Sequence, residues 1–164
     1  MFDIETADIK NGFFMKKIVV MIIAASTFVL AGCVTGSQGV LLVKSPSTNG
    51  VVKVAQTPER GNSADMDANF TAALKGEGLT VMPILAPKAR KSPDVDATVS
   101  YIDVWRWDVV MYLKSISILF YDAETGDLLI KGDWNNSKPH GFRDPKEVMQ
   151  GLVREMLTEL RSAQ

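Results

Sequence analysis

Residues 117–134 read SILFYDAETGDLLIKGDW, which is two apolar runs separated by a short polar segment. In the first run Ile118 and Phe120 share one side of an extended chain, and Leu119 and Tyr121 on the other side are apolar as well. Residues 122–127 have the composition of a tight turn, where Gly126 is free to adopt a positive φ. The stretch therefore predicts a β-hairpin whose first strand is covered on both faces.

Further strands are expected on both sides of this hairpin. Apolar and polar residues alternate through 95–105, and the first hairpin strand is expected to begin at residue 110. Residues 83–94 hold three prolines and predict a loop. Shorter strands are expected at residues 39–44, 51–55 and 79–82.

Two amphipathic helices complete the pattern. Residues 63–75 place Met66, Phe70 and Leu74 on one face. The last helix follows Asp144 as its cap, with Pro145 at its first position. The order of elements predicts one α+β domain, a mainly antiparallel sheet of four to five strands with two helices on one face.

A second informative stretch precedes the predicted sheet. Lys16 and Lys17 are followed by an uncharged run, residues 18–31, which closes on Leu30-Ala31-Gly32-Cys33. A helix over that run rises about 21 Å, which is short of the ~30 Å hydrocarbon core of a bilayer. The run therefore fits a secretory signal better than a membrane span, although a buried core helix or a short membrane anchor would also be apolar.

Residues 15–33 resemble the signal peptide and lipobox of bacterial lipoproteins. The resemblance implies that residues 15–32 are a signal peptide, that Leu30, Ala31 and Gly32 are read by the signal peptidase, and that the Cys33 sulfur carries lipid. Residues 1–14 contain three acidic side chains and are expected to be a mis-called upstream extension of the reading frame. Retention in the inner membrane would favour Asp at the position after the cysteine, which here is Val34. The resemblance therefore implies that the protein is anchored in the outer membrane and faces the periplasm. We expect residues 33–50 to act as a lipid-anchored tether, followed by a single periplasmic domain at 51–164.

The hairpin also resembles a family of small bacterial envelope lipoproteins of unknown function. The shared features are residues 117–134, the strand that includes 96–101, and the closing helix, together spanning about residues 64–163. Ile130-Lys131 replaces the aromatic residue usual before the last glycine. This resemblance implies a fold and a location but no activity.

Composition excludes several kinds of site. The chain has 18 basic and 19 acidic residues, so it lacks the basic excess that nucleic-acid binding needs. Cys33 is the only cysteine and His140 the only histidine, which excludes disulfides and centres built on several thiolates or imidazoles. We expect no cofactor, no metal and no nucleic-acid partner.

The candidate interaction surface lies between the two longest predicted strands. Tyr101, Trp105, Arg106 and Trp107 are of the types that dominate protein-binding hot spots. The alternative is that one tryptophan belongs to the core and the rest to a stabilised turn. A basic loop, with Lys88, Arg90 and Lys91, is either simply solvated or contacts anionic lipid or a partner.

Catalytic residues are not predicted, although two groupings of titratable side chains could support chemistry. His140 with Asp133 or Asp144 could exchange protons near neutral pH, and no nucleophile accompanies it. The second grouping is the set of carboxylates of Asp94, Asp96, Asp103 and Asp108. Two carboxylates held as a pair can hydrolyse glycosides.

Together these observations predict a membrane-anchored, non-enzymatic envelope lipoprotein that acts as a binding or assembly accessory. Its partners would be the membrane, through the anchor, and an envelope protein or peptidoglycan. The alternative is a small periplasmic hydrolase or glycan-binding protein that uses Asp103, Asp108 and His140. A purely structural lipoprotein is the third reading.

Overall fold

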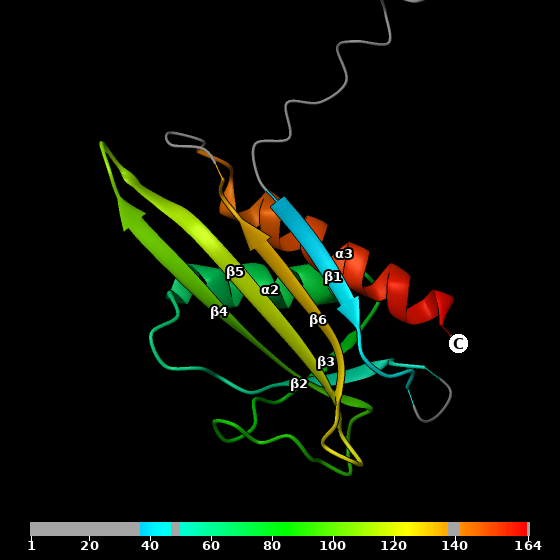
Figure 1. Ribbon diagram of the computed structural model, residues 1–164. Coiled ribbons are helices and arrows are strands. Elements are labelled where there is room, and N and C mark those ends of the chain that lie inside the picture. The colour runs from blue at the N-terminus through cyan, green and yellow to red at the C-terminus, as the bar shows by residue number, and fades with distance from the viewer. Residues whose placement is uncertain (1–36, 47–49, 138–141, 164) are drawn as a thin grey trace, which may run out of the picture. The chain divides into compact units, whose positions relative to one another are not determined.

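The computed structural model describes residues 37–46, 50–137 and 142–163 (Figure 1). These residues belong to the second of the two units into which the chain divides, Thr35–Gln164. The expected signal peptide, its lipobox and Cys33 lie outside the described residues, and so does His140.

A mixed, mostly antiparallel sheet forms one layer of the domain, with strand order β1-β6-β5-β4-β2-β3. Strands β1, β6, β5 and β4 pair antiparallel, whereas β2 is parallel to both β4 and β3. This confirms the α+β class, but the described residues form six strands rather than four to five. The strands are β1 (Ser37–Leu42), β2 (Lys53–Gln56), β3 (Thr80–Met82), β4 (Ala97–Trp107), β5 (Met111–Asp122) and β6 (Leu128–Asn135).

Strand β1 extends the domain into the range 33–50, which was expected to act as a tether. It pairs along its whole length with β6, from Ser37 opposite Asn135 to Leu42 opposite Ile130. Backbone hydrogen bonds to β6 order this segment, and its Val40 and Leu42 side chains pack against the core whereas Leu41 is exposed. The folded domain therefore begins at or before Ser37.

Helices α2 (Ala64–Gly76) and α3 (Pro145–Ser162) lie on the same face of the sheet (Figure 1). Helix α3 begins as its sequence predicts, because the Asp144 carboxylate accepts a hydrogen bond from the Lys146 backbone N–H at 2.9 Å. Neither helix combines the length and apolar content that crossing a membrane requires, among the residues described. The buried face of α3 consists of Val148, Met149, Leu152, Val153, Met156, Leu157 and Leu160.

Helix α3 packs closely against the sheet at Gly132 of β6. A Cβ atom at this position would lie 2.4 Å from the Met156 Sδ atom and 3.0 Å from the Leu152 Cδ1 atom. Both distances are below van der Waals contact, so the missing side chain is what lets the helix settle on β6. Gly39, on the neighbouring strand, has nothing within 4 Å of its hypothetical Cβ.

We expect Gly132→Ala to lower the free energy of unfolding by about 1–3 kcal/mol, because the added methyl group overpacks the helix–sheet contact. Gly39→Ala is the matched control, and should leave stability unchanged or raise it by about 0.5–1 kcal/mol, because alanine costs less backbone entropy than glycine in a strand. Urea titration of both variants measures the difference. Equal effects of the two substitutions would contradict the close contact.

Candidate functional site

The ends of β4 and β5 that join these strands extend as a two-stranded arm, residues 105–113, here called the β-arm (Figure 1). Its pairing continues to Trp107 opposite Met111. At the arm tip, residues 107–111, the side chains of Trp107 and Val109 are 73% and 75% exposed, and Val110 and Met111 are exposed as well. Apart from Asp108, the side chains of the tip are therefore apolar and exposed.

Trp105 lies at the base of the β-arm and is half-buried. Its indole N–H donates a hydrogen bond to the Asp103 carboxylate, and a register shift between Val104 and Trp105 adjusts the strand at this point. Beneath it is a groove of about 460 Å³ between the β-arm and the first turns of both helices. The groove is lined by Ser63, Asp65, Met66, Asn69, Trp105, Met111 and Pro145.

The residues predicted to form an interaction surface are divided between two environments. Trp105, Arg106 and Trp107 lie on the β-arm, and the last two are exposed. Tyr101 lies in the core, 3% exposed, because its position on β4 faces α2. Its ring centroid is 5.0 Å from that of Phe70.

A polar cluster attaches the start of α2 to β4. The Tyr101 hydroxyl donates to the Asp67 carboxylate at 2.5 Å, and the Asn62 side-chain amide donates to the Tyr101 carbonyl at 2.8 Å. The Ser63 hydroxyl donates to Asp103 at 3.0 Å. The cluster therefore holds α2, the helix that lines the groove, against β4. The Oδ1 atoms of Asn62 and Asp103 are buried and accept no hydrogen bond from the described residues.

Three of the candidate carboxylates, those of Asp96, Asp103 and Asp108, are far apart along the chain of β4 and its flanking residues. The Asp96 carboxylate accepts hydrogen bonds from the backbone N–H groups of Val52, at 3.0 Å, and Lys53, at 2.7 Å. Asp103 lies seven positions farther along β4, about 23 Å at the rise of a strand. Paired carboxylates that hydrolyse glycosides are about 5–9.5 Å apart. Asp108 is five positions beyond Asp103, at the arm tip, so it is roughly 16 Å farther still.

Among the described residues, no three His, Cys, Asp or Glu side chains cluster around a common centre. Asp94 is exposed in the segment before β4, and the histidine of the predicted acid–base pair, His140, lies outside the described residues.

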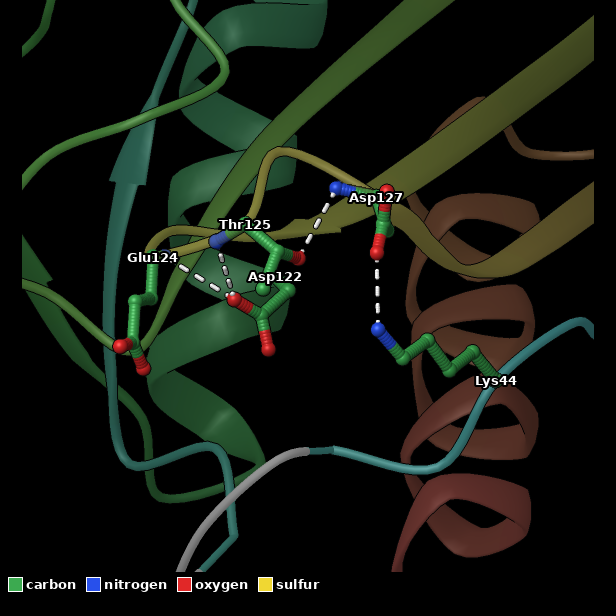
Figure 2. Close-up of polar contacts among 5 residues, drawn as sticks. All are labelled: Lys44, Asp122, Glu124, Thr125 and Asp127. Carbon is green, nitrogen blue, oxygen red and sulfur yellow. Dashed lines mark hydrogen bonds and ion pairs between the residues drawn. The ribbon is translucent and has the colours of Figure 1, made fainter.

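The opposite end of the sheet carries the β5–β6 turn (Figure 2). The Asp122 carboxylate accepts hydrogen bonds from the backbone N–H groups of Glu124 and Thr125, at 2.9 and 2.8 Å. The Lys44 ammonium group is 2.7 Å from the Asp127 carboxylate. Their hydrogen bond lowers the pKa of Asp127 and raises the pKa of Lys44. These acidic side chains fix the turn.

A cavity of about 500 Å³ lies beside this turn, between Ser92 and Glu124. Its two aspartates, Asp96 and Asp122, already accept backbone hydrogen bonds. Arg90 of the basic loop stacks over the Tyr121 ring, 4.6 Å from its centroid. The loop therefore packs against the sheet at the end away from the arm tip.

Sequence reasoning missed Val109, Val110 and Met111 as surface residues. Apolar residues in a hairpin turn are themselves a signal, because such turns ordinarily favour Gly, Asn or Asp. Here the segment between β4 and β5 reads Asp108-Val109-Val110 and contains no glycine.

Comparison with known proteins shows the fold alone. No protein-family model and no curated protein matches the chain. Two solved structures of the PelC dodecamer from Paraburkholderia phytofirmans, one of them a point variant, align with TM-scores of 0.50 at 16% and 14% identity. Each alignment covers 78% of this chain and 100% of PelC. A minor lipoprotein from Acinetobacter baumannii aligns more weakly, with a TM-score of 0.33 at 8% identity over 67% of this chain and 90% of its own.

The polar cluster predicts a specific alkaline response. Burial, followed by the hydrogen bond with Asp67, raises the pKa of Tyr101 far above its ordinary value of 10.0. The folded state therefore favours the neutral hydroxyl. Its contribution to stability is complete below pH 10.0 and declines as the pH rises further, because the tyrosine of the unfolded chain then ionises.

We expect Tyr101→Phe to lower the free energy of unfolding by about 0.5–1.5 kcal/mol at neutral pH through the lost hydrogen bond. It should also flatten the fall in stability above pH 10, as urea titrations across that range would show. Tyr112→Phe on the β-arm is the control. An alkaline slope unchanged by Tyr101→Phe would contradict this role.

Proposed function

We propose that the protein is a lipid-anchored cell-envelope protein that acts as a non-enzymatic assembly accessory. The anchor is Cys33, at the end of the Leu30-Ala31-Gly32-Cys33 segment that follows a basic pair and an apolar run. Val34, directly after it, favours the outer membrane with the domain in the periplasm. Structural support comes from a surface suited to binding another protein rather than to chemistry.

The observation that carries the proposal is the open face of the sheet. Both described helices lie on the other face (Figure 1). Ile102 and Val104 of β4 and Leu41 of β1 are exposed, and Leu119 of β5 lies between them, half-buried. An apolar surface shared by several strands is typical of a protein-binding site.

We infer that this open face binds a further copy of the same chain. PelC, whose solved structures share this fold, is a dodecamer. Polar groups on the same face would orient the contact, since Lys131 and Asp133 form an ion pair of 2.9 Å between the exposed apolar residues. Such a mixture of apolar and polar groups suits an assembly that forms from folded subunits.

A non-enzymatic role is supported by how the acidic side chains are used. Asp96 and Asp122 accept hydrogen bonds from backbone N–H groups, and Asp103 accepts them from Ser63 and Trp105. Each of these carboxylates thus stabilises a local structure. The alternative, a small periplasmic hydrolase or glycan-binding protein, would use Asp103, Asp108 and His140, and the Asp103 carboxylate is already engaged by Ser63 and Trp105.

The open face is tested by a pair of isoleucine substitutions. Ile102→Glu should weaken self-association about tenfold or more, because a carboxylate would be buried in the contact. Ile84→Glu is the matched control, since Ile84 is 69% exposed in the loop after β3. Sedimentation velocity of the purified full chain in detergent measures both. A monomeric native protein, or equal effects of the two substitutions, would contradict the assembly.

The anchor is tested separately in cells. We expect the native protein to incorporate radiolabelled palmitate and to fractionate with membranes, and Cys33→Ser to lose both properties, because two or more acyl chains are needed for firm membrane binding. A Cys33→Ser protein that fractionates like the native one would contradict lipid attachment.

A further inference from the structure

We propose that the arm tip inserts into the interfacial region of the same bilayer that holds the lipid anchor, giving the domain a second membrane contact made of protein. The inference rests on the proposed lipidation of Cys33. It adds an orientation, with the β-arm pointing at the membrane and the β5–β6 turn pointing away from it.

Strand register places the tip and the start of the domain at the same end of the sheet. Ser37, the first residue of β1, is opposite Asn135 of β6, which is opposite Ser115 of β5, which is opposite Val104 of β4. These four residues form one row across the sheet. The β-arm projects from this row, and Figure 1 shows the β4–β5 turn at the end of the sheet where β1 begins.

The length of chain between the anchor and the domain matches the projection of the arm. Cys33 precedes Ser37 by four residues, and an extended chain spans at most about 3.3–3.6 Å per residue, or roughly 14 Å in all. Trp107 lies three positions beyond Val104, about 10 Å along a strand. Acyl chains attached to Cys33 would therefore hold the bilayer within reach of the arm tip.

The chemistry of the tip suits the boundary between headgroups and acyl chains. Trp107, Val109, Val110 and Met111 are all exposed around one turn, and the carboxylate of Asp108, the one charged group among residues 107–111, would face the polar headgroups. Tryptophan is favoured at membrane interfaces because its ring is apolar and its N–H is polar. Arg106, also exposed, lies next to Trp107, where its guanidinium group can meet lipid phosphate.

A bilayer is favoured over a protein partner because the anchor keeps it at high effective concentration beside the tip. The tip is also a narrow projection, so it can enter a fluid interface without a complementary pocket. In this orientation the open face of the sheet remains free for neighbouring copies, because this face lies along the side of the β-arm and not at the arm tip.

The test measures tryptophan fluorescence of the lipidated full chain in vesicles of phosphatidylethanolamine and phosphatidylglycerol, with and without bromine on the acyl chains. The contribution of Trp107 is the difference between the native protein and Trp107→Phe. We expect bromine to quench most of that contribution. Val109→Asp should abolish the quenching, and Val52→Asp should leave it unchanged, because Val52 is exposed beside Asp96 at the opposite end of the sheet.

Two readouts separate the outcomes. A Trp107 emission that shifts to the blue without bromine quenching would mean that the tip is buried against protein, and it would overturn the proposal. Emission typical of water, with no quenching, would overturn it as well. Palmitate incorporation reports on Cys33 independently. Quenching without palmitate incorporation would refute the lipid anchor and retain the tip contact. Palmitate incorporation without quenching would retain the anchor and refute the tip contact.

Discussion

The antiparallel register of β1, β6, β5 and β4 is the constraint on which the rest of the structure depends. Pairing Ser37 with Asn135 fixes the end of the sheet at which the chain enters. Pairing Trp107 with Met111 fixes the end from which the β-arm projects. Because the four strands share one register, the chain enters the sheet at the same end from which the β-arm projects. A slip of one residue in any pair would also turn the apolar side chains from the helix face to the open face.

The two faces of the sheet are distinguished by a steric condition at Gly132. Helix α3 approaches β6 closely there, with Met156 and Leu152 occupying the space that a side chain would need. The polar cluster around Tyr101 and Asp67 joins α2 to the same face. Both helices are thus committed to one side. Apolar residues on the other side, such as Ile102, remain available to a neighbour.

Sequence signals between neighbouring residues predicted the helices and strands, whereas contacts between distant segments determine which side chains are exposed. The Asp144 cap and the 122–127 turn depend on neighbouring residues, so the sequence located α3 and the β5–β6 hairpin well. The pairing of β1 with β6 joins segments about ninety residues apart, which periodicity cannot reveal, and it placed part of the expected tether in the sheet. Likewise, sequence grouped Tyr101 with Trp107, whereas the packing of α2 buries the first and leaves the second exposed.

The proposal that the anchor and the arm tip meet one bilayer can be tested with a pair of spin labels. With Cys33 acylated, a cysteine introduced at Val109 provides a unique thiol for a nitroxide, and Glu124→Cys provides the matching position at the far end of the sheet. Electron paramagnetic resonance of the membrane-bound protein would measure the accessibility of each label to oxygen and to a water-soluble nickel complex. We expect oxygen to relax the label at position 109 preferentially and the nickel complex to relax the label at position 124. Equal and high accessibility of both labels to nickel would contradict the proposal.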